Sequence, residues 1–428
     1  MPLPSGAPPA MPEMGQGNMD RFDATLANLL ARRRLLAAGA AALAGGVIAR
    51  AAGGFSRPAP DAGLVGRPIS ASFPQKGAMI VQRNRPPLLE TPMEVFNDNV
   101  FTPNDRFFVR WHWADIPLEV DAAGFRLTIG GAVKRPLALR LDELLRMPRI
   151  SYAAVNQCSG NSRALFDPRV PGAQWSHGAM GNARWEGVAL SHLLELAGID
   201  PAAARVRFGG LDKPLTAVDP FKKSLAVDHA MDGEVMVAFA MNGEQLPMLN
   251  GFPLRLIVPG WFSTYWVKSL DSIEVLNGPD DNYWMAKAYQ VPTTPHANVV
   301  PGTKEFPKAP ISIMPPRSWI TNLKDGATLP YRPRIGVNGI ALGGDQGVRS
   351  VDISIDGGKS WIASRLGPDE GRYSFRRFSA VVPVLAHGTM TIMSRCTNEK
   401  GEAQPMAPNW NPGGYMRNCV EACTVRLV

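Results

Sequence analysis

Cysteine is scarce in this sequence, with only Cys158, Cys396, Cys419 and Cys423 among 428 residues. Four cysteines are too few for a disulfide scaffold, and none belongs to a CxxC or CxxCH motif or to a His/Cys cluster with the spacing of a zinc or haem site. The sequence therefore argues against a disulfide-rich fold, a structural zinc site and a covalently attached haem. Any metal must be bound in another way.

Clustered positive charge is also missing. The formal net charge is +8, yet only Arg32 to Arg34 form a basic run, and the other basic residues are scattered. Nucleic-acid binding requires basic residues gathered on one surface. We therefore expect no nucleic-acid partner, and a small anionic substrate or an acidic partner protein fits the charge better.

The composition favours a folded chain with many turns. Hydrophobic residues make up 45% and charged residues 19%, which argues against disorder. The 42 glycines and 39 prolines follow no repeat and make an all-helical bundle improbable on compositional grounds. The length predicts two or three domains.

The first 51 residues have the pattern of an export signal. Arg32-Arg33-Arg34 precedes an apolar stretch rich in alanine, which ends at Ala49-Arg50-Ala51, a spacing that a signal peptidase accepts. A membrane anchor is the alternative, but the uncharged run from Leu35 to Ala49 has 15 residues, fewer than the roughly 20 that span a bilayer. Residues 1–51 therefore predict a twin-arginine signal and a periplasmic protein exported already folded, with no membrane span in the mature chain.

Two segments with different sequence patterns follow the predicted signal. Residues 52–95 are rich in proline and lack periodicity, which predicts an extended arm laid over the protein. Residues 96–300 mix short helical patterns with strand-like runs and predict an α+β domain. The expected helices are 141–147 and 190–197, and the expected strands are 125–129, 234–240, 254–258 and 273–276.

Residues 310–428 change to short alternating strands separated by glycine and asparagine. Asp356-Gly357-Gly358 between two such runs is a hairpin signal. The pattern predicts an immunoglobulin-like β-sandwich, a module that pairs subunits more often than it performs chemistry. The expected strands are 350–355, 359–364, 373–382, 390–396 and 420–427.

One cysteine lies in a setting that suits chemistry. Cys158 belongs to the segment Asn156 to Arg163, NQCSGNSR, where Gly and Ser allow sharp turns and an arginine follows five residues later. A nearby guanidinium and polar donors favour the thiolate, the form that binds a metal or attacks a substrate. A buried, unreactive cysteine is the alternative.

Three further segments carry candidate site residues. Arg110 and His112 are two residues apart, so on a strand both point to one face and could form an anion pocket, although an ordinary exposed strand edge explains them as well. The loop Pro259 to Lys268 has backbone amides and a lysine that could hold a phosphate. Tyr289 lies in an aromatic, basic stretch and could equally be a core residue.

Taken together, these segments resemble the sulfite oxidase family of molybdenum enzymes, and most closely its bacterial periplasmic sulfite:cytochrome c oxidoreductases (sulfite dehydrogenases), in their molybdopterin subunit. The resemblance covers roughly residues 90–428, and several long motifs in one order make it specific. The motifs are FFVRWH (107–112), NQCSGNSR (156–163), GAMGNARWEGV (178–188), MNGEQLPMLNGFPLR (241–255), PGWFSTYWVK (259–268) and NWNPGGYMRN (409–418).

The resemblance implies a Mo-molybdopterin cofactor with Cys158 as the protein ligand of the metal. It also implies a substrate pocket and a set of cofactor contacts. Asn250 and Tyr265 depart from the His and Arg of the animal enzymes, which puts these two cofactor contacts in doubt. The implied catalytic residues are Arg110, His112, Arg163, Tyr289 and, from the sandwich, Arg376. The implied cofactor contacts are Phe108, Val109, Arg110, Trp111, His112, Asp212, Asn250, Arg255, Trp266, Val267 and Lys268.

The implied activity is the periplasmic oxidation of sulfite to sulfate. The chain has neither the haem domain of the animal enzymes nor a CxxCH motif, so we expect its electrons to pass to a c-type cytochrome, either a separate protein or a tightly bound subunit. A homodimer or a heterodimer is expected.

Three other functions remain open at this point. A sulfane-sulfur dehydrogenase subunit of a thiosulfate-oxidising complex would need a pocket open to a carrier peptide. A reductase of methionine sulfoxide or nitrate fits the arginine-rich pocket less well. A non-enzymatic periplasmic anion-binding protein would contain no molybdenum.

Strand geometry gives two more expectations. If Cys419 and Cys423 lie on one strand, at about 3.3 Å per residue their Cα atoms are roughly 13 Å apart, beyond disulfide reach. Arg376 and Arg377 should point to opposite faces of their strand, with Arg376 directed into the substrate pocket and Arg377 into solvent.

Overall fold

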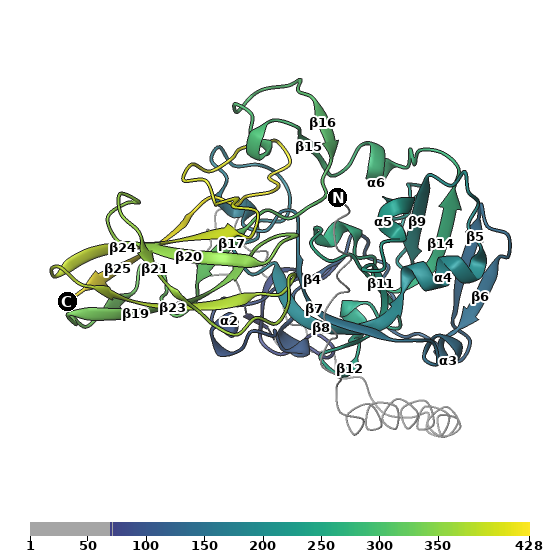
Figure 1. Ribbon diagram of the computed structural model, residues 1–428, viewed down its shortest axis with the longest axis horizontal. Helices are drawn as coiled ribbons and strands as arrows, with labels where there is room; N and C mark the ends of the chain where they lie inside the picture. Colours follow the sequence, from purple (N-terminus) through teal and green to yellow (C-terminus); the bar gives the residue numbers. More distant parts are fainter. Residues whose placement is uncertain (1–68, 71) are drawn as a thin grey trace, which may run out of the picture. The chain divides into compact units, whose positions relative to one another are not determined.

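The computed structural model of the protein describes residues 69–70 and 72–428 (Figure 1). The predicted export signal, residues 1–51, and residues 52–68 of the predicted arm lie outside the described residues. No helix in the described part is long and apolar enough to cross a membrane.

The described part of the predicted arm is not a simple extended segment. It forms three strands of a four-stranded antiparallel sheet, in the order β1-β2-β3-β4. One face of this sheet packs a core cluster that includes Met79, Leu89 and Val109. The strands are β1 (Ile69–Ser70), β2 (Met79–Arg83), β3 (Leu88–Glu90) and β4 (Val109–Arg110).

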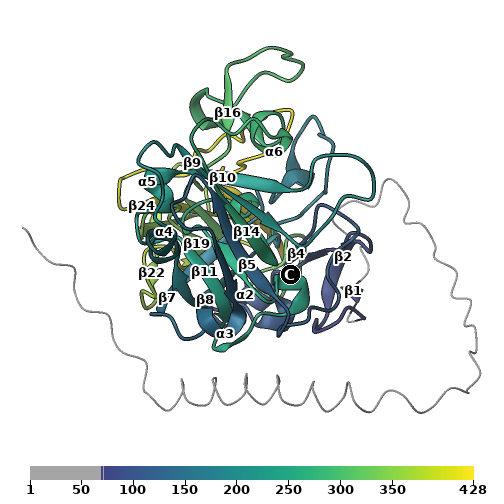
Figure 2. The same ribbon diagram turned by 90° about the vertical axis from the view of Figure 1, so that its right-hand side faces the viewer.

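A second, five-stranded sheet has the order β10-β9-β14-β5-β6, with β14 and β5 parallel and the other pairs antiparallel. Its strands β9, β10, β14 and β5 are labelled in Figure 2. Gly131 needs to be glycine because it has a φ of +81° and its missing Cβ would collide with the carbonyl of Val275. The strands are β5 (Arg126–Gly131), β6 (Leu137–Arg140), β9 (Arg205–Gly210), β10 (Lys222–Ala226) and β14 (Leu270–Leu276).

The third sheet brings the Cys158 segment into place. Its order is β12-β11-β8-β7, with β13 also paired to β11, and β11 is buried along its whole length. Long buried runs of this kind are expected where both faces of a sheet are covered. The strands are β7 (Ile150–Gln157), β8 (Met180–Ala189), β11 (Met236–Met241), β12 (Glu244–Gln245) and β13 (Arg255–Ile257).

Helices are short in the described residues. The longest is α4 (Leu190–Ala197), which buries Leu190, Leu193 and Leu194 and ends at Gly198 with φ +69°, as its leucine spacing and glycine predicted. The predicted helix 141–147 is shorter, α3 (Leu141–Leu144). The other α-helices are α2 (Val95–Asp98), α5 (Val227–Ala230) and α6 (Tyr283–Ala286). The 3-10 helices are η1 (Asn104–Arg106), η2 (Arg163–Leu165), η3 (Met248–Asn250), η4 (Ser263–Tyr265) and η5 (Pro295–Ala297).

A small hairpin of β15 (Gln290–Pro292) and β16 (Lys308–Pro310) precedes the C-terminal domain. That domain is a sandwich of two sheets, β17-β19-β23-β22 and β18-β25-β24-β20-β21, which confirms the predicted class of α+β followed by a β-sandwich. Val337 and Phe378 of the first sheet pack with Val351 of the second. The strands are β17 (Arg317–Ile320), β18 (Thr328–Leu329), β19 (Arg334–Leu342), β20 (Val348–Ser354), β21 (Ile362–Ala363), β22 (Arg365–Leu366), β23 (Arg376–Pro383), β24 (Gly388–Asn398) and β25 (Glu421–Leu427).

All four cysteines are free thiols. Cys423 lies on β25, but Cys419 precedes that strand, so the premise that both lie on one strand is wrong. Their failure to form a disulfide stays a prediction for mass spectrometry of the unreduced protein.

The sandwich contacts the α+β part through the chain just before β23. The amide of Val155 on β7 donates to the carbonyl of Tyr373 at 2.9 Å. The side-chain amide of Asn182 on β8 donates to the hydroxyl of Ser374 at 2.8 Å. The sandwich is therefore fastened to β7, which ends just before Cys158, and to its neighbour β8.

Candidate active site

Cys158 lies directly after β7, in a loop held by backbone hydrogen bonds. Its amide donates to the carbonyl of Ala179 at 2.9 Å, and its carbonyl accepts from the amide of Asn161 at 2.9 Å. Ser162 has a φ of +69°, a conformation that most residues avoid. The chain thus turns sharply twice between the thiol and Arg163, as the Gly and Ser residues of this segment indicated.

Cys158 lines two adjoining cavities, which share Arg110, His112 and Tyr289. We call the first the Lys268 cavity. The second, with a volume of about 220 Å³, is the Arg163 pocket. The Lys268 cavity is lined by Phe108, Arg110, His112, Asn156, Cys158, Ser159, Phe221, Arg255, Ser263, Thr264, Trp266, Lys268 and Tyr289. The Arg163 pocket is lined by Arg83, Leu88, Arg110, Trp111, His112, Cys158, Arg163, Pro171, Gly172, Ala173, Trp175, Tyr289, Gly413 and Tyr415.

Four of the predicted cofactor residues line neither cavity. Val109 points into the core with Met79 because neighbouring strand residues face opposite sides. Asn250 lies behind the wall: its side-chain amide donates to the Phe108 carbonyl at 3.1 Å, and its carbonyl oxygen accepts from the ammonium of Lys76. Asp212 and Val267 are buried near Lys268 without reaching the cavity surface.

Arg376 is the clearest correction. Its guanidinium donates to the carbonyl of Gly367 at 3.1 Å and to the carboxylate of Asp369 at 2.6 Å, and it lines neither cavity. Arg377 is not a free solvent charge either, since it donates to the backbone carbonyl of Asn97 at 2.7 Å. The prediction that Arg376 binds substrate is therefore wrong.

The sandwich domain reaches the Arg163 pocket through another segment, the run 409–418. The guanidinium of Arg163 donates to the carbonyl of Gly413 from Nη2 at 3.0 Å and from Nε at 3.2 Å. It lies 5.0 Å from the ring centre of Tyr415, and that ring stacks on Tyr289 at 5.5 Å. The motif was visible in the sequence, but nothing in it showed that residues 250 positions away would meet.

Three glycines also lie against the Arg163 side chain. A Cβ on Gly160, Gly172 or Gly414 would come closer than 3.0 Å to the Arg163 side chain. The third arginine donor, Nη1, bonds the carbonyl of Ala173 at 3.3 Å. Arg163 is therefore held in one position by backbone groups on several sides.

His112 and Tyr289 form a neutral pair. The Nε2 atom of His112 and the hydroxyl of Tyr289 are 2.6 Å apart. Burial, assisted by the charges of Arg110 and Lys268, holds the pKa of His112 well below its usual value. Burial raises the pKa of Tyr289 above its usual range, so the phenol keeps its proton.

The Lys268 cavity is lined by several cationic side chains. Burying such a charge without a counter-charge costs free energy. Burial lowers the pKa of Lys268 to about 7, and the charge of Arg255 acts in the same direction. Burial also raises the pKa of Asp212 to about 6, against the effect of Lys268. A bound anion would restore the charged form of the lysine.

Several buried polar atoms around this cavity have no hydrogen-bond partner within the described residues. Such atoms are rare in folded proteins and indicate a missing ligand or water. Each can donate a hydrogen bond, so the cavity suits a ligand with many acceptor atoms. They are Arg110 Nη1, His112 Nδ1, Asn156 Nδ2, Ser159 Oγ, Arg255 Nε and Thr264 Oγ1.

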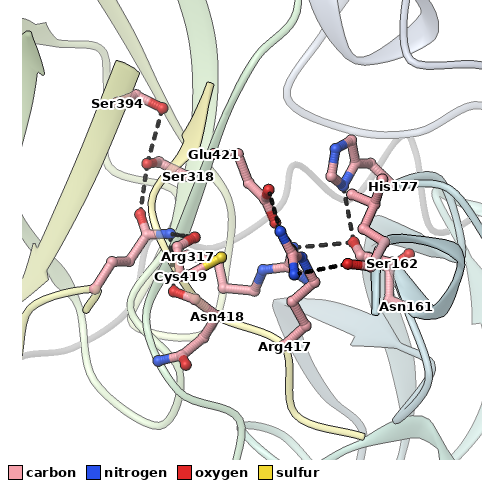
Figure 3. A network of polar contacts seen from close by, with 12 residues as sticks. Asn161, Ser162, His177, Arg317, Ser318, Ser394, Arg417, Asn418, Cys419 and Glu421 are labelled. Carbon is pink, nitrogen blue, oxygen red and sulfur yellow. Dashed lines mark hydrogen bonds and ion pairs between the residues drawn. The ribbon is translucent and has the colours of Figure 1, made fainter. Parts of the chain in front are cut away.

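A polar network behind the Cys158 loop connects it to the sandwich (Figure 3). Arg317 on β17 donates to the hydroxyl of Ser162 at 3.0 Å and to the carboxylate of Glu421 at 3.1 Å. Arg417 holds the same carboxylate with two bonds, at 3.0 and 3.1 Å. His177 lies 2.8 Å from the Ser162 hydroxyl.

Comparison with known proteins matches both parts of the chain. The family model described as an oxidoreductase molybdopterin-binding domain matches residues 113–284, and the one described as a Mo-co oxidoreductase dimerisation domain matches residues 308–426. Human mitochondrial sulfite oxidase is 34% identical over 80% of this chain, and the chain spans 64% of its length. Sulfite oxidase of Gallus gallus is 32% identical over 84% of this chain and 79% of its own. The solved structure of the sulfane dehydrogenase SoxCD from Paracoccus pantotrophus superimposes with a TM-score of 0.70 and 27% identity, covering 89% of this chain and 95% of that one.

The residues present fit a Mo-molybdopterin cofactor, which is the cofactor of this chain. Cys158 is the cysteine of the Lys268 cavity, and a thiolate is a suitable soft ligand for the metal. Within residues 69–70 and 72–428 no cluster of three His, Cys, Asp or Glu side chains could hold a metal without such a cofactor. Arg255, Lys268 and the unpaired donors would hold the acceptor atoms of the pterin and its phosphate.

Proposed function

This chain belongs to the sulfite oxidase family of molybdenum oxidoreductases, and on that premise we propose that it oxidises sulfite to sulfate and delivers the electrons to a c-type cytochrome. The observation that carries the proposal is the meeting of the Cys158 thiol with Arg110, Arg163 and the His112–Tyr289 pair in two adjoining cavities. A cationic pocket beside the cysteine that would bind the metal suits a small sulfur oxyanion.

The reaction converts sulfite and water into sulfate, two protons and two electrons. When bound, the cofactor supplies the two-electron oxidation and the oxygen atom that sulfur gains. The protein binds and orients the anion: Arg110 lines both cavities, and its buried Nη1 atom has no hydrogen-bond partner among the described residues. Arg163 contributes its positive charge and the N–H that remains on each of Nη1 and Nη2, because backbone carbonyls already accept from its other three N–H groups.

The neutral His112–Tyr289 pair gives the pocket hydrogen bonds without a further charge. One proton lies between His112 Nε2 and the Tyr289 oxygen, and the remaining imidazole nitrogen, Nδ1, has no partner within the described residues. We expect this pair to bond an oxygen of sulfite and to stay uncharged near neutral pH, because burial lowers the pKa of His112 and raises that of Tyr289.

We further propose that the protein acts in the periplasm, where residues 1–51 would direct it, and that it works as a dimer or with a cytochrome subunit. The match of the sandwich to a dimerisation domain supports the first kind of assembly. Light scattering of the mature protein, with and without the c-type cytochrome of the same organism, would distinguish the two.

The test of the proposed function combines metal analysis with kinetics. Protein matured in a host that makes molybdopterin should contain about one molybdenum per chain and reduce cytochrome c when sulfite is added. Cys158→Ser should abolish this turnover and leave the circular dichroism spectrum unchanged, because an alkoxide or water replaces a soft thiolate. Near-normal sulfite oxidation by that variant would contradict the proposed role of Cys158.

A second candidate, the oxidation of protein-bound sulfane sulfur, is favoured by one observation. The SoxCD structure, whose title describes a sulfane dehydrogenase, is matched over 95% of its chain. Turnover with a carrier protein bearing a persulfide, in the absence of turnover with sulfite, would support this candidate over sulfite oxidation.

A further inference from the structure

Arg83, in the part of the chain that the sequence indicated to be a simple arm, lies in the substrate pocket. It is the last residue of β2 and lines the Arg163 pocket together with Cys158. Arg83 pairs with Leu88 across the sheet, and Leu88 pairs in turn with Arg110. Directly paired residues point to the same face of a sheet. Arg83 and Arg110 therefore face the same cavity from β2 and β4.

A break in the strand register directs Arg83 to this face. Val81 pairs with Leu89, but the next pair is Arg83 with Leu88, so Gln82 is an extra residue. Without this bulge Arg83 would share the face of Val81, which packs against the apolar cluster of Met79 and its neighbours. The bulge keeps the guanidinium out of the core and turns it toward the pocket, as bulges beside functional sites do.

The donors of Arg83 are available. Its side chain is exposed, and within residues 69–70 and 72–428 its guanidinium has no hydrogen bond or ion pair. Arg110 likewise has a free donor, Nη1, which is buried. Arg163 is more fully engaged, since each of its three nitrogens already donates to a backbone carbonyl, which leaves one N–H on Nη1 and one on Nη2. Arg83, toward solvent, and Arg110, inside, are thus the less engaged guanidinium groups of the pocket.

We propose that Arg83 binds the substrate oxyanion at the mouth of the Arg163 pocket and, with Arg110, gives the site its preference for anionic sulfur compounds. Neighbouring strands are about 4.8 Å apart, so the Cα atoms of the two arginines are separated by roughly 10 Å. Two arginine side chains can close that distance around one small anion, with the apolar Leu88 between them. The inference rests on the proposed function only for the identity of the anion.

The test compares Arg83→Gln with Arg85→Gln. Arg85 lies two residues further on, in the turn after β2. It is exposed and lines neither cavity, so Arg85→Gln removes the same charge outside the pocket. Arg83→Gln should raise the KM for sulfite about fivefold to tenfold and leave kcat within about twofold, because an interaction made at the pocket mouth holds substrate and transition state alike. Arg83→Lys should recover part of the loss, and Arg85→Gln should behave like the wild type.

Binding of inorganic sulfate to the molybdenum-loaded protein, measured by calorimetry, separates this inference from the proposed function. Arg83→Gln should raise the Kd for sulfate by a factor similar to that for KM. A wild type that binds sulfate through Arg83 without oxidising sulfite would contradict the proposed function and support the role of Arg83. Equal sulfate binding by the two variants, or no sulfate binding by the wild type, would overturn the role of Arg83 even if sulfite is oxidised.

Discussion

Tyr289 illustrates how a single side chain is fixed for one task. It has a φ of +58°, an unfavourable conformation for a residue with a side chain, and its ring lies between His112 and Tyr415. That conformation aims the hydroxyl at His112 Nε2. The strain is located where a directed hydrogen bond is needed, which fits a site that is organised before the substrate arrives.

Tyr289→Phe removes one hydroxyl and leaves the ring stack in place. We expect kcat/KM for sulfite to fall about tenfold, the loss of one hydrogen bond to a charged ligand, while the thermal midpoint changes little. Cytochrome c reduction over a range of sulfite concentrations measures the effect. Tyr283→Phe is the control, because Tyr283 is half exposed and lines neither cavity, and an equal loss from that variant would contradict the specific role.

His177 should make the stability of the fold depend on pH. Burial lowers its pKa from 6.5 to about 4, against the effect of Glu421. The unfolded chain then binds the proton more strongly than the folded one, so this contribution to stability is complete above pH 6.5 and is lost as the pH falls toward 4. The side chain is partly exposed, so we expect a loss of about 2 kcal/mol at most.

Urea unfolding at pH 7.5 and pH 5 measures this loss, and His177→Gln is the matched variant. The wild type should lose more free energy of unfolding between the two pH values than His177→Gln does. Identical losses in both proteins would assign the pH dependence to other groups.

At the scale of elements, the Cys158 loop depends on glycine for more than flexibility. Gly160 has an ordinary φ, yet its missing Cβ would collide with the guanidinium of Arg163. Gly160→Ala should therefore push Arg163 away from the Gly413 carbonyl and lower kcat/KM about tenfold or more. Gly130→Ala is the control, since no atom lies within 4 Å of its missing Cβ. Similar activity of the two variants would show that Arg163 can move without consequence.

Local periodicity predicted part of the elements. The leucine spacing and Gly198 predicted α4, and alternation predicted β20, β23, β24 and β25 of the sandwich, but β19 and the long strands β7 and β8 were not predicted. It was harder to predict from the sequence what each face of a strand contacts. The family resemblance implied that Arg376 enters the pocket, and alternation set Arg377 on the opposite face, but alternation gives two faces without saying what each face meets. Arg376 instead forms an ion pair with Asp369, which lies seven residues earlier in the chain.

The bulge at Gln82 shows a second limit. The sequence from Met79 to Glu90 contains no glycine and no signal of an inserted residue, so counting by twos places Arg83 on the wrong face. Only the fit of Val81 and Leu89 into the core cluster reveals the extra residue. Arg83 and Tyr415 were missed for this common reason: their roles depend on pairings between distant segments.

At the scale of the whole described unit, Glu421 joins the sandwich to the Cys158 loop through Arg317 and Arg417. Glu421→Gln would leave the buried guanidinium of Arg317, 1% exposed, without its counter-charge. Breaking a buried pair on one side costs about 3 kcal/mol or more. We expect that loss in urea unfolding, accompanied by weaker sulfite binding because Ser162 adjoins Arg163.

Asp142→Asn provides the control for charge removal. Asp142 pairs with Arg140 and Arg146 on the exposed surface of α3. Exposed pairs add little to stability, so unfolding of this variant should match the wild type. If Glu421→Gln were as stable as Asp142→Asn, the ion pairs of Glu421 with Arg317 and Arg417 would not stabilise the contact between the sandwich and the Cys158 loop.

The bond from Arg163 to the Gly413 carbonyl has a consequence for the order of assembly. It joins residues 250 positions apart, one in the Cys158 loop and the other in the segment 409–418. Until the ribosome has added residues 413–415, which come shortly before β25, the pocket has its cysteine and its first arginines but neither the Tyr415 ring nor the carbonyl that orients Arg163. The pocket is thus completed last, so a truncated chain would lack a finished catalytic centre even where its first domain had folded.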